Sequence, residues 1–287
     1  MELLSRFTLQ VLGKDIILFG APGCGVLGER CQVAYYGCLM TNVPSSMTGV
    51  KRYFDRIHQE VTCVALVGDG TTADVGFQVL SAAAERGEKI LYICYDNEGY
   101  MNTGIQRSST TPLSSWTTTT PIGPKGRGKK NVSKNVPLLM AFHEIPYVAT
   151  ATLAFLEDYA EKLKKAQTAS KDGMAYIHVL TPCPTGWRSA PNSVLELCRA
   201  AVESNYFPLW EADYGAIRIT HQVPYPKPVK DFTKLMGRFS HLSAAELHHL
   251  QEYTDRRYEQ IKKLSELGGV MEPMRQNAKA DPQNLCP

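Results

Sequence analysis

Two short apolar runs are each followed by polar residues whose types suit an ion with oxygen ligands. The runs are Cys63–Val67 and Ile90–Tyr95, both too short for a helix, so we expect them to form buried parallel strands. Asp69 follows the first run with a carboxylate, and Asn97 and Gly99 follow the second with an amide and a backbone carbonyl. Mixed oxygen ligands of this kind suit Mg²⁺ or Ca²⁺.

Glycines on both sides of Asp69 add a second feature. Because they lack side chains, Gly68 and Gly70 let the backbone approach a phosphate closely. The pattern therefore predicts a diphosphate held through a divalent cation. Asn97 comes 28 positions after Asp69, a spacing that resembles the GDG…Asn motif of thiamine diphosphate enzymes. An ordinary pair of α/β loops is the alternative, which GDG alone would favour but GDG together with the asparagine does not.

The segment between the two runs predicts how they are joined. Val75–Arg86 repeats apolar residues at the three- and four-residue spacing of one helix face. Strand, helix and strand in succession form a βαβ unit. In a doubly wound sheet the carboxyl ends of the strands face the ligand crevice. We therefore predict an α/β fold with a doubly wound parallel sheet that binds thiamine diphosphate at those ends.

Composition limits the remaining classes. The chain has 287 residues, 44% apolar and 21% charged, with a net charge of +3. We expect one α/β domain over 1–230 and a helical tail over 231–287 for subunit packing, its end disordered. The charge is too small to indicate nucleic acid, and no apolar run approaches the roughly 18 residues of a membrane span. Met1–Leu12 is typical of an amphipathic helix rather than a signal peptide, so we expect a cytoplasmic protein.

Periodicity predicts the other elements. We expect helices over 47–59, 135–143, 158–169 and 193–204. We expect strands over 16–19, 147–151 and 175–180, and a hairpin over 207–220.

Four segments together resemble one family. They are GDGTTADVGFQ, DNEGYMNTGIQRSSTTP, IPYVATA at Ile145–Ala151 and PCPTGW at Pro182–Trp187. In this order, over roughly residues 1–267, the chain is similar to the β subunit of pyruvate:ferredoxin oxidoreductase and related 2-oxoacid:ferredoxin oxidoreductases. The resemblance implies thiamine diphosphate and Mg²⁺ as cofactors, with the ion held by Asp69, Asn97 and the Gly99 carbonyl.

The resemblance also implies roles for three further residues. Cys24 and Cys183 match cysteines that bind a [4Fe–4S] cluster beside the thiamine, and Asn102 matches an asparagine on its substrate side. For Cys24 the alternative is a small apolar filler, and for Asn102 it is stabilisation of its own turn. Cys63 and Cys94 lie inside the predicted strands, so we expect them to be packing residues.

Function and partners follow from the same resemblance. It implies oxidative decarboxylation of a 2-oxoacid to an acyl-CoA and CO₂, with electrons passed through the cluster to ferredoxin. Partners are α, γ and δ type subunits, coenzyme A and the 2-oxoacid; one partner chain supplies the activating glutamate, so this chain alone should be inactive. Pyruvate is the first candidate, while a branched 2-oxoacid, 2-oxoglutarate, oxalate or an aryl glyoxylate stays open. A non-redox thiamine diphosphate decarboxylase subunit and a cofactor-free scaffold are the alternatives.

The cluster ligands are incomplete, because the family's CxGC segment has no counterpart before Cys24. A [4Fe–4S] cluster ordinarily takes four cysteines. We expect that Met1 is an internal methionine preceded by that segment; otherwise the cluster is lost or uses Cys31 and Cys38. Those two cysteines would share a helix face, although core filling is the favoured interpretation.

The remaining segments allow less specific predictions. The hydroxyl-rich segment Ser108–Pro121 should be a loop that covers the cofactor. Gly123–Lys134 should be a solvated basic loop, or else a docking site for an acidic carrier or for the phosphates of coenzyme A. His178 should be a hydrogen-bonded core histidine. Solvated histidines are expected at His241, His248 and His249.

Overall fold

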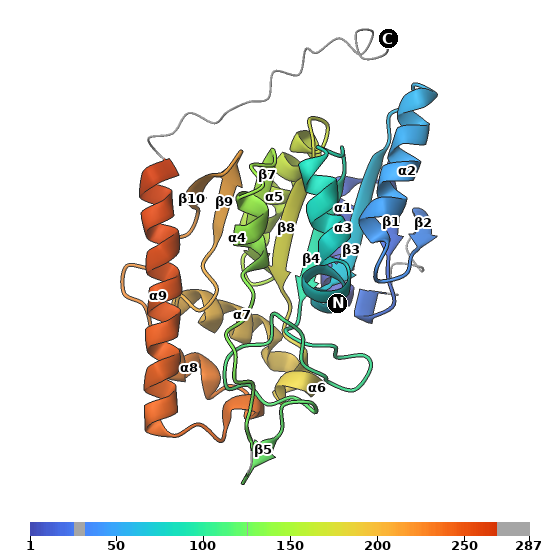
Figure 1. Ribbon diagram of the computed structural model, residues 1–287. Helices are drawn as coiled ribbons and strands as arrows, with labels where there is room; N and C mark the ends of the chain where they lie inside the picture. The colour runs from blue at the N-terminus through green and yellow to red at the C-terminus, as the bar shows by residue number, and fades with distance from the viewer. Residues whose placement is uncertain (26–31, 125, 269–287) are drawn as a thin grey trace.

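Short buried runs form the strands of an eight-stranded sheet (Figure 1), in the order β10-β9-β7-β8-β4-β3-β1-β2. The structure is a computed structural model that describes residues 1–25, 32–124 and 126–268. Six of the strands run parallel, and β9 and β10 add to β7 in antiparallel fashion. The strands are β1 Ile16–Gly20, β2 Ala34–Gly37, β3 Thr62–Gly68, β4 Leu91–Asp96, β7 Tyr147–Thr152, β8 Ala175–Leu180, β9 Trp210–Asp213 and β10 Ala216–Ile219.

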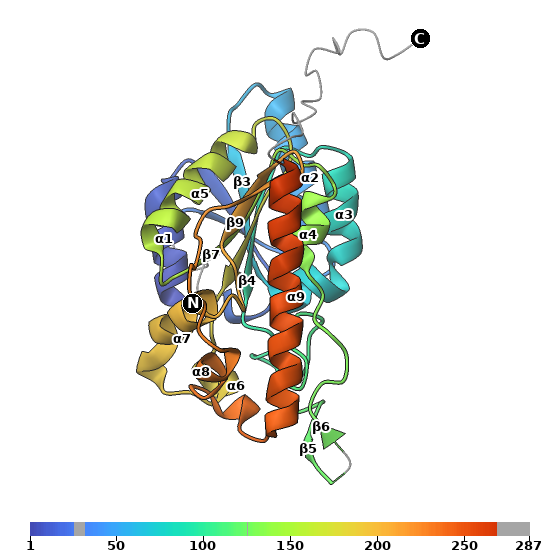
Figure 2. The same cartoon turned by 90° about the vertical axis from the view of Figure 1, so that its left-hand side faces the viewer.

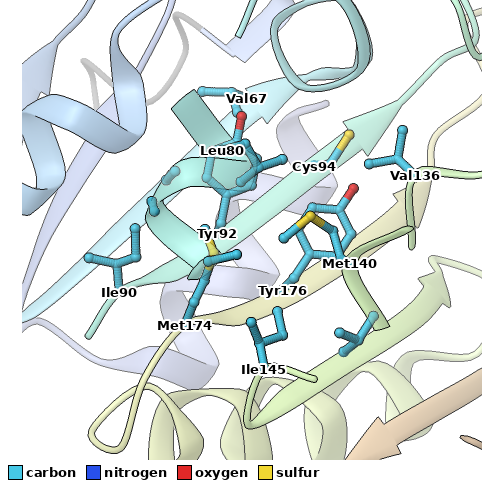
Figure 3. Packing of buried hydrophobic residues seen from close by; sticks show 14 of the residues in the cluster. Val67, Leu80, Ile90, Tyr92, Cys94, Val136, Met140, Ile145, Met174 and Tyr176 are labelled. Carbon is cyan, nitrogen blue, oxygen red and sulfur yellow. The ribbon is translucent and has the colours of Figure 1, made fainter. Parts of the chain in front are cut away.

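Helices cover both faces of this sheet (Figure 2). On one face, α1 (Glu2–Leu12) and α5 (Leu156–Ala169) bury Leu4 and Tyr159 against strand residues such as Leu18. On the other face lie α2 (Val43–Arg56), α3 (Phe77–Glu85) and α4 (Val136–Ala141). Figure 3 shows the packing there, where Val136 and Met140 of α4 lie over Cys94 and Tyr176 of the sheet.

A third apolar cluster lies beyond the carboxyl end of β8. It is built from α6 (Pro184–Trp187), α7 (Val194–Glu203), α8 (Val229–Thr233) and the first half of α9 (Ala244–Gly268), at the lower end of the sheet in Figure 1. The Trp187 and Phe232 rings meet edge to face with centroids 6.1 Å apart. We call this set of residues the C-terminal cluster. The remaining part of α9 packs along β10.

The turn after β3 departs from regular helix. Gly70–Val75 form a π-helix, in which the Gly76 N–H donates to the Thr71 carbonyl at 2.9 Å. A side chain on Gly76 would place its Cβ 2.5 Å from that same carbonyl oxygen, so glycine is required there. Single turns of π-helix occur frequently at functional sites.

The predicted doubly wound sheet is confirmed, as are the strands at Cys63–Val67 and Ile90–Tyr95. The helix expected over Val75–Arg86 begins two residues later, after the π-helix. The helix expected from 47 begins at Val43, because a proline at position 44 is tolerated in a first helical turn.

One prediction in these segments was wrong. Residues 34–37 form strand β2, so the helix face proposed for Cys31 and Cys38 does not exist; Cys38 is a buried core residue as expected, and Cys31 lies outside the described residues. The hairpin predicted over 207–220 is confirmed by the antiparallel pair of β9 and β10, which also joins the main sheet beside β7. Pro184 begins the short helix α6, a position at which proline is favoured.

Two further expectations concern the membrane and the chain end. Across the described ranges, no helix combines the length and apolar character needed to cross a bilayer. The expected disorder beyond Gly269 lies outside the described residues.

Candidate functional site

Three oxygens converge where β3 and β4 end. The two strands are neighbours in parallel register, with Gly68 opposite Tyr95, so the residues that follow them share one edge of the sheet. The amide oxygen of Asn97 lies 2.7 Å from the Gly99 carbonyl oxygen and 3.2 Å from Asp69 Oδ1. Two arrangements satisfy these oxygens. In one, the Asn97 amide is turned over and its NH₂ donates to the Gly99 carbonyl and to Asp69. In the other, a cation is bound by all three oxygens.

The oxygen cluster fits Mg²⁺. An octahedral Mg²⁺ ion binds its ligands at about 2.0–2.1 Å, which separates neighbouring ligand oxygens by roughly 3 Å. The two separations given above are close to this value. Carboxylate, amide and backbone carbonyl are also the ligand types that a hard cation takes, so the residues present could hold the ion.

Buried charge gives a second reason for a cation. Asp69 is only 1% exposed, and its pKa is raised well above the ordinary value by burial and then by the charge of Asp96. The Thr110 hydroxyl lies 3.0 Å from Asp69 Oδ2 and 2.8 Å from Asp96 Oδ1. One hydroxyl has a single hydrogen to donate, so two adjacent carboxylates must share it. A bound cation or an extra proton is therefore needed to relieve the repulsion between them.

Asp96 is itself held by a buried network. Its Oδ2 lies 2.8 Å from Nε2 of His178, whose Nδ1 lies 2.7 Å from the Tyr176 hydroxyl. The Glu98 backbone N–H donates to Asp96 Oδ1 at 2.7 Å. The prediction of a hydrogen-bonded core histidine at position 178 is confirmed. The sequence analysis gave Asp96 and Thr110 no role, although both lie in segments that it singled out.

A cavity of about 90 Å³ opens beside the three oxygens. Its lining includes Asp69, Asn97 and Gly99, together with Cys24 and Asn102 from the two flanking loops. The structure thus brings together the oxygen ligands, one predicted cysteine and the predicted substrate-side asparagine.

Gly70 allows close packing at the mouth of this cavity. The Tyr100 ring occupies the space that a Cβ on Gly70 would need, and the Tyr100 hydroxyl donates to the Gly70 carbonyl at 3.2 Å. Gly68 packs in a similar way against the ring of Tyr95. The predicted role of both glycines, close approach of backbone to a ligand, stays a prediction, because the space beside each is filled by a tyrosine ring.

The loop that carries Cys24 is held in place by Tyr95. The Gly25 N–H donates to the Tyr95 hydroxyl at 2.8 Å, and the ring fills the space beside Gly23. Burial, followed by the nearby Cys183, raises the pKa of the Cys24 thiol, while a backbone hydrogen bond from Asn102 opposes the rise. Cys24 lines the cavity, and Cys183 lies at the start of α6.

The cysteines do not complete a cluster site. Cys183 caps the short helix α6, where its Sγ accepts from the Gly186 N–H at 3.5 Å. Among the described residues, no three His, Cys, Asp or Glu side chains are grouped to hold a metal. Buried packing positions hold four of the other cysteines, as expected for Cys38, Cys63 and Cys94; the fourth is Cys198. Two thiols do not make the usual four-cysteine set.

The hydroxyl-rich loop over 108–121 lies against the oxygen cluster, as its Thr110 contacts show. The adjoining basic loop was predicted to be solvated, and this is wrong for Lys129, whereas Arg127 and Lys130 are exposed. Lys129 is 5% exposed and donates to the carbonyls of Ser109 and Thr111. Lys134 donates to the Ala73 carbonyl. A third cation, at position 127, pairs with the carboxylate at position 246, and position 125 lies outside the described residues.

Histidines in the C-terminal part divide into two kinds. His248 and His249 are exposed on α9, as predicted. His241 does not fit that prediction, because both of its ring nitrogens are buried without a hydrogen-bond partner.

Comparison with known proteins defines the class. Residues 28–179 match the family model described as thiamine pyrophosphate enzyme, C-terminal TPP binding domain. The solved 2-oxoglutarate:ferredoxin oxidoreductase of Magnetococcus marinus has a similar fold, with a TM-score of 0.54 and 20% identity over 68% of this chain and 74% of that chain. The fold is therefore that of the thiamine-pyrophosphate-binding domain.

Closer relatives identify the family. The chain is 46% identical to the ketoisovalerate oxidoreductase subunit VorB of Pyrococcus furiosus and 40% identical to the pyruvate synthase subunit PorB of Methanocaldococcus jannaschii, covering 89% of each. It is 44% identical to the β subunit of the NADH-dependent phenylglyoxylate dehydrogenase of Aromatoleum evansii, of which it spans 61%. These alignments cover 92%, 88% and 92% of this chain. The chain belongs to the β subunits of the 2-oxoacid:ferredoxin oxidoreductase family.

Proposed function

We propose that this chain is the thiamine diphosphate- and Mg²⁺-binding β subunit of a 2-oxoacid:ferredoxin oxidoreductase, with pyruvate as the first candidate substrate. The observation that carries the proposal is the convergence of the Asp69, Asn97 and Gly99 oxygens beside the cavity. The similar relatives support it, because each is named for a 2-oxoacid: pyruvate, ketoisovalerate or phenylglyoxylate.

The chain's own residues would bind and orient the cofactor. Thiamine diphosphate supplies, when bound, the chemistry that removes CO₂ from a 2-oxoacid. Asp69, Asn97 and the Gly99 carbonyl would hold Mg²⁺, which in turn binds the diphosphate oxygens. Backbone at Gly70 would lie against the diphosphate. Asn102, which lines the same cavity, would face the substrate.

The cover over the site would exclude water. Thr110 and Thr111 are buried, and the Thr111 hydroxyl donates to the Glu98 carbonyl at 2.7 Å, which ties the covering loop to the metal-binding turn. A site closed in this way strengthens the electrostatic interactions inside it.

Electron transfer would belong to the assembled complex. Cys24 and Cys183 would face an iron–sulfur cluster, and the similarity to subunits of an oxidoreductase and a dehydrogenase favours a redox enzyme over a non-redox decarboxylase. Partner subunits of α, γ and δ type would supply the remaining parts, including the activating glutamate, with coenzyme A taking the acyl group and ferredoxin the electrons. A brown colour in the purified complex would support this assignment.

Calorimetric titration with thiamine diphosphate and Mg²⁺ tests the binding site. Asp69→Ala should weaken binding at least about a hundredfold, or about 2.7 kcal/mol, because it removes the charged ligand. Asn97→Ala should weaken binding less, because a neutral oxygen is lost. Asp231→Ala is the control, since this carboxylate lies on α8 and pairs with Lys234. A wild-type protein without heat of binding would indicate a cofactor-free scaffold, and full cofactor retention by the Asp69 variant would show that the site is wrongly placed.

A further inference from the structure

The turn that carries two of the proposed metal ligands has an unfavourable backbone conformation. Glu98, between Asn97 and Gly99, has φ +60°, in the left-handed region that residues with a side chain rarely adopt. Such a residue persists only where its surroundings fix it. The contacts of Glu98 therefore determine where the Asn97 and Gly99 oxygens lie.

Every polar group of Glu98 has a partner in the structure. Its N–H donates to Asp96, and its carbonyl accepts from Thr111. The carboxylate is buried, where it accepts from the Tyr206 hydroxyl at 2.8 Å and pairs with the guanidinium of Arg238. Arg238 comes 140 positions later in the sequence, so a distant part of the chain holds this turn.

Arg238 is positioned by the C-terminal cluster. It is 1% exposed, and its guanidinium lies 3.7 Å from the centre of the Trp187 ring and 5.0 Å from that of Phe239. The Trp187 indole N–H donates to the Asn97 carbonyl at 2.8 Å. Two stacked side chains of one cluster thus hold consecutive residues of the metal-binding turn.

The same segment reaches the covering loop and the loop of Cys183. The Arg238 carbonyl accepts from the Trp116 N–H at 3.1 Å. The neighbouring Gly237 N–H donates to the Arg188 carbonyl at 2.9 Å, just after α6, and the Arg188 guanidinium lies 3.4 Å from the centre of the Trp116 ring. Movement of Arg238 would therefore displace three site segments together.

We propose that Arg238 is a positioning residue that sets Mg²⁺ affinity and selectivity by fixing Glu98, and with it the Asn97 and Gly99 oxygens. The proposal rests on the proposed function, because it needs the ion to bind at these oxygens. Arginine suits the task, since its planar guanidinium can stack on an indole while it bonds a carboxylate. Residues that orient metal ligands through hydrogen bonds typically change metal affinity about 10- to 100-fold when they are replaced.

Titration of Mg²⁺ at saturating thiamine diphosphate tests this proposal in the full chain. Arg238→Met should weaken Mg²⁺ binding about 10- to 100-fold. Ca²⁺ binding should weaken less, because Ca²⁺ tolerates irregular coordination whereas Mg²⁺ requires near-octahedral ligands. A fall in the ratio of the Mg²⁺ to the Ca²⁺ association constant is the readout that a general loss of stability would not produce. Arg238→Lys, which keeps the charge but not the planar fork, should recover only part of the loss.

Two further variants keep the test decisive. Lys162→Met is the matched control: Lys162 is also 1% exposed and pairs with Asp158, but it contacts Thr150 of β7 and Thr220 just after β10, away from the turn. It should lower stability without changing the ion ratio. If Arg238→Met does not fold, the double variant Glu98→Gln with Arg238→Met leaves no unpaired charge and should still bind Mg²⁺ weakly.

The outcomes separate the two proposals. Wild-type affinity and ion ratio in the folded Arg238 variants, or an equal change in Lys162→Met, would overturn the positioning role while leaving the proposed function intact. A wild-type chain that binds neither Mg²⁺ nor thiamine diphosphate would instead overturn the proposed function.

Discussion

At the residue scale, the site has more hydrogen-bond acceptors than donors around Asp69. Thr110 has one hydroxyl hydrogen for two buried carboxylates, Asp69 and Asp96. The Asn97 amide faces two further acceptors, which either its NH₂ group or a cation can satisfy. Buried polar groups are ordinarily satisfied, so such a concentration of acceptors indicates a place where positive charge belongs.

Replacement of Thr110 measures this effect. Thr110→Val should lower the free energy of unfolding by about 1.5–3 kcal/mol without metal, because a hydrogen bond to a buried charged group is lost. With saturating Mg²⁺ and thiamine diphosphate the loss should be smaller, since the cation then neutralises Asp69. Urea unfolding in both conditions gives the two values. Thr110→Ser keeps the hydroxyl and is the control; an equal cost of Thr110→Val with and without Mg²⁺ would contradict the shared-hydrogen interpretation.

Sequence reasoning reached some of these residues and not others, for a physical reason. Asp69, Asn97 and Gly99 belong to a local pattern, a short strand followed by a polar turn, and the structure brings them together. His178 and Thr110 contact Asp96 across 82 and 14 positions of sequence. Such contacts depend on the order of the strands, which hydrophobic periodicity does not specify.

At the scale of elements, strands were predicted well and the elements after them less well. A buried parallel strand is a short continuous apolar run, so its bounds can be read directly. The winding of Gly70–Val75 into a π-helix is accompanied instead by close packing at Gly76, where a Cβ would clash with the backbone of Thr71 and Met40. The short helix α6 is too short for a periodic pattern to predict, and its Pro184 lies in the first helical turn, which tolerates proline.

The covering loop offers a prediction about pH. Burial and the nearby Arg107 lower the pKa of Lys129 to about 8, from 10.5. Between these values the unfolded chain binds a proton at this lysine that the folded chain has released, so stability rises with pH. Relative to Lys129→Met, the wild-type free energy of unfolding should therefore increase from pH 8 to pH 10, by at most about 3 kcal/mol. Below pH 8 the difference should be constant.

Urea unfolding at pH 7, 8, 9 and 10 checks this slope. The matched control is Lys130→Met, because its side chain is exposed one position away. A wild-type advantage that stays flat or falls with pH, or the same slope for the Lys130 variant, would show that Lys129 is not the buried amine that binds this loop.

At the scale of the whole molecule, the three apolar clusters have different structural roles. Two of them sandwich the sheet and fix the ends of β3 and β4. The C-terminal cluster contributes Trp187 and Arg238 to the metal-binding turn, so the helices after 180 are part of the site. The sequence predicted the tail as a surface or subunit-packing element. Amphipathic periodicity indicates that a helix has a packing face, but it does not identify the element that covers this face.

Iron binding is the last prediction, and it depends on how many of the eight cysteines can reach one cluster. Cys24 lines the cavity and Cys183 caps α6, while Cys38, Cys63, Cys94 and Cys198 are buried in packing, and Cys31 and Cys286 lie outside the described residues. A [4Fe–4S] cluster ordinarily takes four thiolates. Anaerobic reconstitution of the 287-residue chain with iron and sulfide should therefore give clearly fewer than about four irons per chain, while thiamine diphosphate and Mg²⁺ still bind. Four irons per chain, lost on Cys24→Ser or Cys183→Ser, would show instead that this chain completes a cluster by itself.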